Sequence, residues 1–521
     1  MNVRELTAPL LHPVISGGLD TEITGIAYDS RKVKPGFAFV ALRGGKADGH
    51  DFIDKAIELG AALIIAESPG SYETKVPWVH VSDTRLALAS VAGAFYGFPA
   101  SHMAVTGITG TNGKTTIAFL VHHLMNHAQR RCGLLGTVHY DLGGEIVPAT
   151  HTTPESLEIQ QHLATMLDRG CRAVAMEVSS HALHQHRAHG IPFKAAVFTN
   201  LTQDHLDYHG TLENYFDAKS ILFETVAAQK DGKMVINGDD SWGRKLALRF
   251  ESTGRVVTYG FGVGCTMRAL NVRYDATGTT FTLEAKGREY LVRMPLVGDF
   301  NVYNALAALG AAEAVGVNFR EAVTNLKSAP QVPGRLERVS EEQERFQVYV
   351  DYAHTPDAIV NALKAIRALR PNRLITVFGC GGDRDRSKRP LMARAAEQGS
   401  DICILTSDNP RTEDPAQIIK DASAGFTKRN YTAIVDRREA IQAAINNAGP
   451  GDIIVIAGKG HEDYQDIQGV KHPFDDRRVA HGLLRARRDA MGQQRLEDEK
   501  MREQGIWPPR NDRDGRGGMR R

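Results

Sequence analysis

Cysteine, long apolar runs and excess charge of either sign are all scarce in this chain of 521 residues. The five cysteines, Cys132, Cys171, Cys265, Cys380 and Cys403, are odd in number and form no CxxC pair. Their spacing argues against a disulfide framework and against a thiolate zinc site, and it fits a reducing compartment.

No apolar run reaches the roughly 18 residues that a membrane-spanning helix needs. The first residues, MNVRELTAPLLHP, also lack the basic stretch and apolar core of a secretory signal. We therefore expect a soluble, unexported protein of the cytoplasm that does not insert into a membrane.

The 63 basic and 61 acidic residues leave a formal charge of +2. This balance gives no bulk attraction to nucleic acid or to an anionic membrane, so we expect no nucleic-acid partner and only local anion sites. With 42% hydrophobic residues, the chain can bury substantial cores, and its length predicts about three domains. We expect a monomer that acts on small molecules.

The order of apolar runs and turns predicts an α/β fold in several domains. Residues 1–98 contain short apolar runs between turn-rich segments, which is typical of a small α/β domain. Residues 99–330 open with a buried strand, a glycine loop and an apolar-periodic helix, as a nucleotide-binding α/β domain does. Alternating residues over 265–297 predict antiparallel hairpins within this central domain.

The pattern beyond residue 330 predicts a Rossmann-like domain over residues 331–490. Apolar runs at 374–378, 402–406 and 453–457 each end in a polar or glycine loop, with helical patterns between them. This arrangement is typical of a doubly wound parallel sheet, whose ligands bind at the carboxyl ends of the strands. Residues 491–521 are highly charged without apolar periodicity, so we predict a disordered or partly helical tail.

The clearest chemical motif is the glycine loop GITGTNGKTT at residues 107–116. Glycines let backbone N–H groups approach phosphate oxygens, Lys114 can span the β- and γ-phosphates, and Thr115 can hold Mg²⁺. A strict GxxxxGK[ST] pattern misses this variant loop because position 108 is isoleucine. The loop predicts ATP or GTP binding but leaves the reaction open. The residues assigned to the nucleotide are Gly110, Thr111, Asn112, Gly113, Lys114, Thr115 and Thr116.

Further motifs follow one another along the chain. They are DSR at residue 29, HTTPE at 151, EVSSHALHQHR at 177, TNLTQDHLDYHG at 199, YFDAKSILF at 215, GDFNVYNALAA at 298, PGRLE at 333, VDYAHTP at 350, GGDRDRSKRP at 381, DNPR at 408 and GKGHE at 458. From Asp29 to Arg478 this series resembles the Mur ligase family. Folylpolyglutamate synthetases are similar in the phosphate loop and the YAHTP-like segment, so the other motifs distinguish among the members of the superfamily.

The resemblance implies a three-domain Mur ligase architecture: a UDP-sugar-binding domain, a central ATP-binding domain and an amino-acid-binding Rossmann-like domain. It implies an ATP-dependent ligase of peptidoglycan synthesis that adds meso-diaminopimelate to UDP-N-acetylmuramoyl-L-alanyl-D-glutamate. The D-glutamate carboxylate would attack the γ-phosphate of ATP, and the amine would then displace phosphate from the acyl phosphate. Positioning and charge stabilisation by Lys114 and Mg²⁺ suffice for this chemistry, so no side-chain nucleophile is required.

Four residues are expected to serve catalysis: Lys114, Glu177, His205 and Lys219. Glu177 follows an apolar strand and His205 lies in a loop, where both can reach a cation beside the phosphates. The resemblance implies that both hold Mg²⁺ together with Thr115. A partly buried Lys219 would have a lowered pKa and could react with CO₂. The resemblance implies that its carbamate is a further Mg²⁺ ligand, whereas the sequence alone also allows a snorkelling surface lysine.

Two further groups of residues are expected to bind nucleotides. Asn301 and Asn304 share a face of a predicted helix and suit an adenine ring, and the resemblance adds Arg335, Asp351 and His354. A strand-end cap is the alternative role for Asp351. A UDP-sugar needs hydroxyls, amides and an arginine, although each Ser or Thr can instead be a cap or turn residue. By resemblance, the UDP-sugar group is Tyr28, Ser30, Thr152, Thr153, Ser179, Gln185 and Arg187.

The acceptor amino acid is expected to bind in the third domain. Diaminopimelate has a carboxylate that lysine lacks, and a guanidinium can hold a carboxylate with two hydrogen bonds. Arg411 of DNPR is the candidate, because lysine-adding relatives lack it; an ion pair with Asp408 or Asp414 is the structural alternative. The whole group implied by the resemblance is Arg384, Asp408, Asn409, Pro410, Arg411, Gly458 and Glu462.

Two alternative functions stay open at this point. One is a lysine-adding ligase of the same family. The other is a nucleotide-binding regulator or kinase that uses the same fold.

Overall fold

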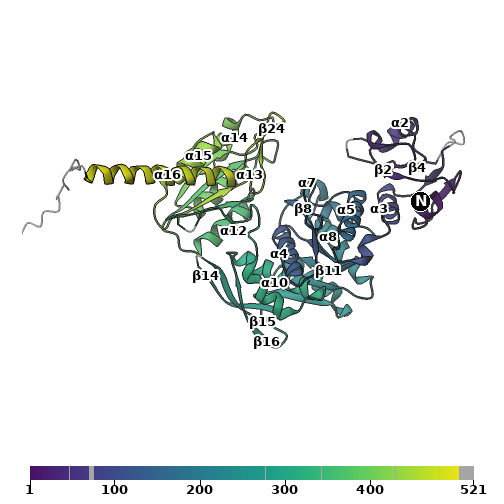
Figure 1. Cartoon of the computed structure of the whole chain (residues 1–521), viewed down its shortest axis with the longest axis horizontal. Helices are drawn as coiled ribbons and strands as arrows, with labels where there is room; N and C mark the ends of the chain where they lie inside the picture. Colours follow the sequence, from purple (N-terminus) through teal and green to yellow (C-terminus); the bar gives the residue numbers. More distant parts are fainter. Residues whose placement is uncertain (46, 70–75, 276, 342, 429, 504–521) are drawn as a thin grey trace, which may run out of the picture. The chain divides into compact units, whose positions relative to one another are not determined.

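A computed structural model of the chain describes residues 1–45, 47–69, 76–275, 277–341, 343–428 and 430–503 (Figure 1). The chain divides into two compact units, Met1–Val332 and Pro333–Arg521, here called unit 1 and unit 2. Unit 1 contains two separate sheets, and unit 2 contains one six-stranded sheet and a hairpin. The predicted boundary at residue 330 lies two residues before the division between the units. The boundary at residue 98 stays a prediction.

The first sheet of unit 1 has five strands in the order β1-β5-β4-β3-β2. Its strands are parallel except for the β1–β5 pair. Alternate residues of β4 enter different apolar clusters, Leu63 and Ile65 on one face and Ile64 on the other, because both faces are covered. The elements are α1 Val3–Thr7, β1 Val14–Ser16, β2 Gly25–Ala27, β3 Phe37–Val40, α2 Ile53–Glu58, β4 Leu63–Ala66, β5 Trp78–His80 and α3 Thr84–Phe95.

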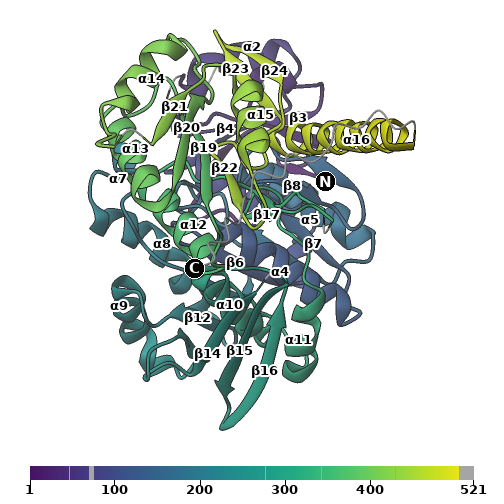
Figure 2. The ribbon, with the colours of Figure 1, turned by 90° about the vertical axis from the view of Figure 1, so that its left-hand side faces the viewer.

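The second sheet of unit 1 has eleven strands in the order β16-β15-β14-β13-β12-β11-β6-β10-β7-β8-β9. Its centre is parallel, and β14, β15 and β16 pair antiparallel (Figure 2), which confirms the hairpins predicted over residues 265–297. The strands are β6 Ala104–Thr109, β7 Cys132–Leu135, β8 His139–Asp141, β9 Ile146–Pro148, β10 Ala173–Glu177, β11 Phe193–Phe198, β12 Lys233–Asn237, β13 Val256–Gly260, β14 Met267–Asp275, β15 Gly278–Ala285 and β16 Arg288–Met294.

Helices cover both faces of this sheet. Ala173 and Ala175 of β10 pack in the cluster of α4 and α10, whereas Val174 and Met176 pack in the cluster of α5 and α8. Strands buried on both faces are continuously apolar, which is why the sequence lacks a two-residue alternation there. The helices are α4 Lys114–His127, α5 Ser156–Asp168, α6 Ser180–His184, α7 Leu206–His209, α8 Leu212–Ala227, α9 Ser241–Phe250, α10 Asp299–Ala314 and α11 Phe319–Asn325.

The main sheet of unit 2 has the strand order β17-β18-β22-β19-β20-β21. All its neighbours are parallel except β17 and β18, which confirms the predicted doubly wound sheet. The strands are β17 Glu337–Arg338, β18 Gln347–Asp351, β19 Leu374–Cys380, β20 Ile402–Ser407, β21 Tyr431–Ala433, β22 Ile453–Ala457 and the hairpin β23 Tyr464–Ile467 and β24 Val470–Pro473. The helices are α12 Pro356–Arg367, α13 Lys388–Gly399, α14 Pro415–Ser423, α15 Arg437–Asn447 and α16 Asp476–Glu503.

The helix α16 extends into the predicted tail, for which the sequence left a disordered and a partly helical state open. It continues through residues 491–503 and projects beyond the sheet of unit 2 (Figure 1), so this part is helical rather than disordered. Arg487 fastens the helix to unit 2, because its guanidinium donates to the carbonyl oxygens of Ile445 and Ala448. The charged residues around Leu496 form no continuous apolar stripe, and the sequence alone therefore did not decide between the two states. The rest of the predicted tail, including Trp507, lies outside the described residues.

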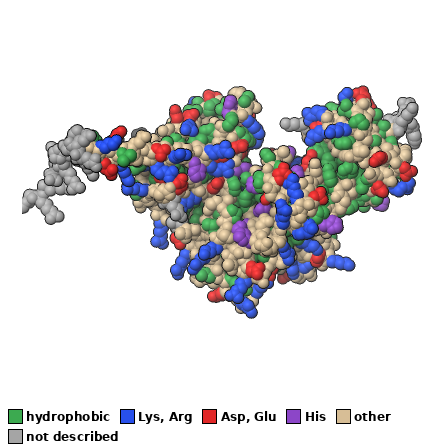
Figure 3. Space-filling view, viewed as in Figure 1, with side chains coloured by type: hydrophobic (Ala, Val, Ile, Leu, Met, Phe, Trp, Pro, Cys, Tyr) green, Lys and Arg blue, Asp and Glu red, His purple; other side chains and the backbone are tan. Residues whose placement is uncertain are grey.

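The surface carries mixed charge. Basic and acidic side chains are interspersed on the face shown in Figure 3. Among the helices that the structure describes, none combines the length and the apolar character needed to cross a membrane.

Candidate functional site

The predicted phosphate-binding residues of unit 1 meet at one edge of the eleven-stranded sheet. β6, β10 and β11 are parallel neighbours, so their carboxyl ends lie side by side. The phosphate loop follows β6, Glu177 ends β10, and Thr199 follows β11. Segments separated by up to about ninety residues of sequence therefore converge on one loop.

The phosphate loop needs glycine at two positions. Gly110 has φ +139°, and a Cβ there would lie 1.8 Å from Thr199 Oγ1. Gly113 has φ +91°, and a Cβ there would lie 2.5 Å from Asn304 Oδ1. Asn200 holds the loop from β11: its carbonyl accepts the Thr111 N–H at 2.9 Å, and its Oδ1 accepts the Asn112 N–H at 3.0 Å.

Lys114 and Thr116 begin α4 directly after this loop. The Lys114 ammonium donates to the carbonyl oxygens of Gly110 at 2.8 Å and Thr111 at 2.9 Å, which curls the side chain back over the loop. Thr116 is 4% exposed and lies in the first turn of α4. A basic side chain over the N-terminus of a helix is suited to phosphate oxygens.

Glu177 and Thr115 form the oxygen-rich part of the site. The Thr115 hydroxyl donates to Glu177 Oε2 at 3.1 Å, so both oxygens can reach one cation. Thr137 fixes the carboxylate through its backbone N–H at 2.8 Å and its hydroxyl at 3.1 Å. Gly136 leaves room for it, since a Cβ there would lie 2.5 Å from Glu177 Oε1. The donor set fits Mg²⁺, which prefers hard oxygen ligands.

Lys219 of α8 is fully buried beside the same loop. Its side chain is 1% exposed, and its ammonium donates to the Gly110 carbonyl at 2.9 Å and lies 4.3 Å from the centre of the Tyr215 ring. Burial lowers the pKa of Lys219 well below its ordinary value, and the charge of Lys114 lowers it further. The burial excludes the snorkelling surface lysine that the sequence left open, and it favours a neutral amine.

His205 lies in the loop before α7 with a left-handed backbone, φ +53°. Its ring is 4.9 Å from the ring of His181 and 6.0 Å from that of Tyr215, which places it near Lys219. Burial lowers the pKa of His205, although Asp204 opposes the shift. A neutral imidazole is the form that binds a metal ion. Among the residues that the structure describes, no three His, Cys, Asp or Glu side chains form a metal cluster by themselves.

Five of the predicted UDP-sugar residues are connected around the end of β10. The Thr153 hydroxyl donates to the Glu177 carbonyl at 2.9 Å and accepts the Ser179 N–H at 3.0 Å. Thr152 lies 3.1 Å from Thr137 through their hydroxyl oxygens. Ser179 also caps α6 by accepting the Ala182 N–H, so the predicted cap role is present.

Arg187 links this group together. Its guanidinium donates to the Thr153 carbonyl at 3.0 Å and to Gln185 Oε1 at 2.7 Å, and it forms an ion pair with Glu155 at 3.0 Å. The Gln185 amide donates to the Tyr208 hydroxyl at 3.1 Å. The sequence assigned no role to Glu155 or Tyr208, although both lie inside quoted motifs.

The two N-terminal members of the UDP-sugar group lie near α5. The Tyr28 hydroxyl donates to Glu158 Oε1 at 2.8 Å. Ser30 begins a short 3₁₀ helix, Ser30–Lys32, which Asp29 caps by accepting the Arg31 N–H. Ser30 is partly exposed and is available to a ligand.

The predicted adenine residues share one face of α10, as expected. Asn301 and Asn304 are 2% and 5% exposed. The Asn304 amide donates to Asn301 Oδ1 at 3.0 Å, and the Asn301 amide donates to the Val297 carbonyl at 2.9 Å. Asn304 Oδ1 faces Gly113 of the phosphate loop.

The ATP residues expected in unit 2 lie together at the end of β18. Asp351 accepts the N–H groups of Leu336 at 2.7 Å and Ala353 at 2.9 Å, so it is a cap of the kind that the sequence allowed. Burial raises the pKa of Asp351, and Arg335 partly opposes this. The Arg335 guanidinium lies 4.6 Å from the centre of the Tyr352 ring, and His354 Nδ1 lies 2.7 Å from the Tyr352 carbonyl.

Arg411 is held in an unusual conformation after β20. Its backbone has φ +51°, its N–H donates to the Asp466 carbonyl at 2.9 Å, and its guanidinium donates to the Gly382 carbonyl at 2.6 Å. Within the described residues it forms no ion pair with Asp408 or Asp414, so the structural alternative that the sequence left open is wrong. Arg384 is exposed, with its guanidinium 3.4 Å from the Asp383 carbonyl.

The loops DNPR and GKGHE contact each other. Asn409 donates to Glu462 Oε2 at 2.8 Å and accepts from the buried Lys459 ammonium at 2.9 Å. Gly458 has φ +121°, and a Cβ there would lie 2.4 Å from Asp408 Oδ2. The neighbouring Pro410 carbonyl packs on Gly382. The sequence missed Lys459, although it lies inside a quoted motif.

Comparisons with known proteins agree with these three sheets. The model of the Mur ligase family catalytic domain matches residues 22–96, that of the Mur ligase middle domain matches residues 108–312, and that of the Mur ligase glutamate ligase domain matches residues 334–460. The chain is 44% identical over 489 residues to the UDP-N-acetylmuramoyl-L-alanyl-D-glutamate–2,6-diaminopimelate ligase of Solibacter usitatus, covering 93% of this chain and 98% of that protein. The chain belongs to the Mur ligase family.

Other Mur ligases and a folylpolyglutamate synthase are also similar. The ligase of the same name from Geobacillus kaustophilus is 46% identical over 476 residues, covering 90% of this chain and 96% of the relative. A solved structure of a ligase of that name matches with a TM-score of 0.69 and 35% identity, covering 94% of this chain and 99% of the other. The folylpolyglutamate synthase of Mycobacterium tuberculosis matches with a TM-score of 0.59 and 20% identity, covering 72% and 92%, and shows the shared fold alone. The predicted three-domain Mur ligase fold is therefore confirmed.

Proposed function

We propose that this Mur ligase adds meso-diaminopimelate to the D-glutamate of UDP-N-acetylmuramoyl-L-alanyl-D-glutamate, with ATP as cosubstrate. The reaction belongs to peptidoglycan synthesis, and its substrates place the enzyme in the bacterial cytoplasm. The observation that carries the choice of acceptor is Arg411, whose guanidinium has no carboxylate partner at Asp408 or Asp414 and can hold a substrate carboxylate.

The phosphoryl transfer is assigned to the phosphate loop and its neighbours. Backbone N–H groups of the loop and the Lys114 ammonium would bind the β- and γ-phosphates while the D-glutamate carboxylate attacks the γ-phosphate. Mg²⁺ bound by Thr115, Glu177 and His205 would neutralise charge on the transferred group. The product of this step is an acyl phosphate, whose phosphate leaves far more readily than hydroxide.

Lys219 is assigned to the same ion through a carbamate. Its burial favours the neutral amine, which can react with CO₂ to give a carboxylate. This change converts a cationic position beside Gly110 into an anionic oxygen ligand. The Gly110 carbonyl keeps the Lys114 ammonium as a second donor, so the modification leaves no buried acceptor unpaired.

The amide bond is assigned to the loops of unit 2. Arg411 and Arg384 would hold the distal carboxylate of diaminopimelate, and Glu462, Asp408 and the Gly458 carbonyl would hold its distal ammonium. The free amine would then attack the acyl phosphate carbon and expel phosphate. Holding both reactants in one orientation supplies much of the acceleration.

The test is phosphate release by the purified chain with ATP, Mg²⁺ and UDP-N-acetylmuramoyl-L-alanyl-D-glutamate. Separate reactions receive meso-diaminopimelate, lysine or no amino acid, and mass spectrometry identifies the products. Arg411→Ala is compared with Arg394→Ala, which removes an exposed arginine of α13 outside the proposed site.

The expected result is release and a new amide only with meso-diaminopimelate, reduced in Arg411→Ala and unchanged in Arg394→Ala. Turnover with lysine instead would support the lysine-adding alternative. No phosphate release with any amino acid would support the regulator, and a stable phosphorylated product without free phosphate would support the kinase.

A further inference from the structure

Arg437 at the start of α15 has a completely buried side chain. Both Arg437 and its partner Asp476 are 0% exposed in their side chains, and their ion pair has an N–O distance of 2.7 Å. Removing two charges from water is costly, and the cost is offset only when the remaining donors and acceptors are also bonded. The other partners of the guanidinium therefore indicate what this pair does.

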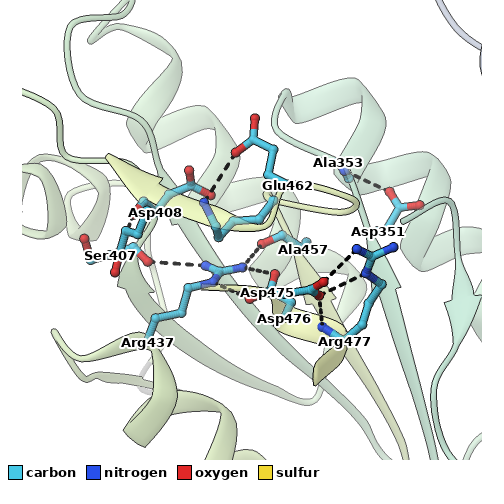
Figure 4. Close-up of polar contacts among 12 residues, drawn as sticks. Asp351, Ala353, Ser407, Asp408, Arg437, Ala457, Glu462, Asp475, Asp476 and Arg477 are labelled. Carbon is cyan, nitrogen blue, oxygen red and sulfur yellow. Dashed lines mark hydrogen bonds and ion pairs between the residues drawn. The ribbon is translucent and has the colours of Figure 1, made fainter. Parts of the chain in front are cut away.

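The guanidinium connects the ends of two strands (Figure 4). Its Nη1 donates to the Ser407 carbonyl at 3.3 Å, and its Nη2 donates to the Ala457 carbonyl at 3.1 Å. Ser407 and Ala457 are the last residues of β20 and β22, which are separated in the sheet by β19. No backbone hydrogen bond of the sheet can join these two ends directly. The planar guanidinium is the group that does so.

The next residues are the first residues of the two amino-acid loops. Asp408 begins DNPR and Gly458 begins GKGHE. Their contact is close, since a Cβ on Gly458 would lie 2.4 Å from Asp408 Oδ2 and 3.8 Å from Arg437 Nη2. A shift of either strand end would therefore move one loop relative to the other. Both loops carry residues assigned to diaminopimelate.

We propose that Arg437 is a positioning residue that fixes the spacing of the DNPR and GKGHE loops and so sets the affinity for the acceptor amino acid. The identity of that amino acid as meso-diaminopimelate rests on the proposed function. The role of Arg437 in fixing the distance between the two loops does not depend on the proposed function.

The charges around the guanidinium support this role. Burial lowers the pKa of Arg437, but Asp476, Asp408 and Glu462 raise it by more, and it stays charged. Asp476 neutralises this charge at 2.7–2.8 Å. The Glu462 carboxylate pairs with the Lys459 ammonium at 3.3 Å, whereas Asp408 Oδ2 is buried without a hydrogen-bond partner among the described residues. The Asp408 carboxylate is therefore left for the ammonium group of an amino acid.

A matched control exists at the opposite ends of the same sheet. Arg373 donates to Asp452 Oδ2 at 3.0 Å and 2.6 Å and to the Asn447 carbonyl at 2.8 Å. Arg373 precedes β19 and Asp452 precedes β22, so this ion pair fastens the amino ends of the strands. It resembles the Arg437 pair chemically but lies away from both loops.

The experiment compares Arg437→Lys and Asp476→Asn with Arg373→Lys and Asp452→Asn in the full chain. Steady-state KM is measured for meso-diaminopimelate, ATP and the UDP-sugar substrate, together with the thermal midpoint. Lysine keeps the charge but cannot serve a carboxylate and two carbonyls in one plane. We expect KM for meso-diaminopimelate to rise roughly 10- to 100-fold in Arg437→Lys, as is typical when a supporting contact is lost. Asp476→Asn should give a smaller rise, because both carbonyl contacts remain.

The two KM values for ATP and the UDP-sugar should stay within about threefold of wild type, well below the shift expected from a displaced supporting contact. The control variants should lower the thermal midpoint without changing KM for any substrate. A merely structural role of Arg437 would produce the control pattern, and that result would overturn the proposal. If Arg437→Lys does not fold, Asp476→Asn decides the question.

Amide hydrogen exchange separates this inference from the proposed function. We expect faster exchange in residues 408–411 and 458–462 of Arg437→Lys, but not of Arg373→Lys, whether or not the chain turns over meso-diaminopimelate. A wild type inactive with meso-diaminopimelate would refute the proposed function and leave this measurement intact. Unchanged exchange in both loops would refute the role of Arg437.

Discussion

Replacing Lys219 with methionine should stabilise the protein at neutral pH while abolishing the ligase reaction. Because its folded-state pKa is lowered, Lys219 releases a proton on folding, whereas in the unfolded chain it stays charged up to a pKa of about 10.4. Between these two pKa values the unfolded state binds more protons, so the stability of the wild type rises with pH. Methionine has a similar length and no charge, and it removes this dependence.

The magnitude follows from the linkage relation. Each pH unit between the folded-state pKa and the unfolded-state pKa changes the free energy of unfolding by about 1.4 kcal/mol. The lost hydrogen bond to the Gly110 carbonyl offsets about 1 kcal/mol, and that carbonyl still accepts from Lys114. Lys219→Met should therefore be more stable than wild type at pH 7, and this advantage should shrink by about 1.4 kcal/mol for each pH unit on approach to a pH of about 10.4.

The assay is thermal and denaturant unfolding in CO₂-free buffer at pH 7, 8 and 9. The control is Lys245→Met, which removes an exposed lysine lying 4.9 Å from the centre of the Trp242 ring. The difference in free energy of unfolding between Lys245→Met and wild type should be the same at every pH. Labelled bicarbonate should add a carbamate signal to the wild type that Lys219→Met lacks. If the free energy of unfolding depended on pH in the same way for Lys219→Met and wild type, Lys219 would be charged in the native state. That result would refute the reasoning.

Three further changes have defined outcomes. Arg411→Ala should lower kcat/KM for meso-diaminopimelate about 10- to 100-fold, because charge-assisted hydrogen bonds contribute about 1.5–3 kcal/mol. Glu177→Gln should raise the Mg²⁺ concentration for half-maximal phosphate release roughly 10- to 100-fold, since an amide is a weaker ligand than a carboxylate. Removing residues 494–521 should leave kcat and the thermal midpoint unchanged, because the contacts of Arg487 with Ile445 and Ala448 precede the cut.

Different results would count against each of these expectations. An unchanged kcat/KM for meso-diaminopimelate in Arg411→Ala would remove its role as the selector. An unchanged Mg²⁺ dependence in Glu177→Gln would mean that the Glu177 carboxylate does not bind the metal ion and only accepts hydrogen bonds from Thr115 and Thr137. A lower thermal midpoint after truncation would mean that the last part of α16 stabilises unit 2.

Much of the fold could be predicted because local sequence determines it. Strands buried on both faces are continuous apolar runs, and β10, β19 and β22 lie where such runs occur. The extension of α16 to Glu503 was left open, since a solvated helix without an apolar stripe resembles a charged tail in sequence.

The candidate site was predicted where a residue type and a strand end coincide. Gly110, Lys114 and Glu177 belong to short motifs with a chemical reason for each residue, and parallel strands bring their ends together. Asn200 and Thr137 were missed because they act on the loop and on Glu177 from other strand ends; Asn200 lies inside a quoted motif that gave it no role, and no motif marks Thr137. Asn200 and Thr137 meet their hydrogen-bond partners only in the folded chain.

The sequence by itself determined the three α/β regions, the phosphate loop and the order of motifs that carries the family resemblance. Only the tertiary structure decided that Lys219 is buried, that Arg411 forms no ion pair with Asp408 or Asp414, and that Arg437 joins the ends of β20 and β22. The physical reason is that propensity and periodicity depend on neighbouring residues. Burial, and with it the pKa of a lysine or the partners of a guanidinium, depends on segments that are distant in sequence.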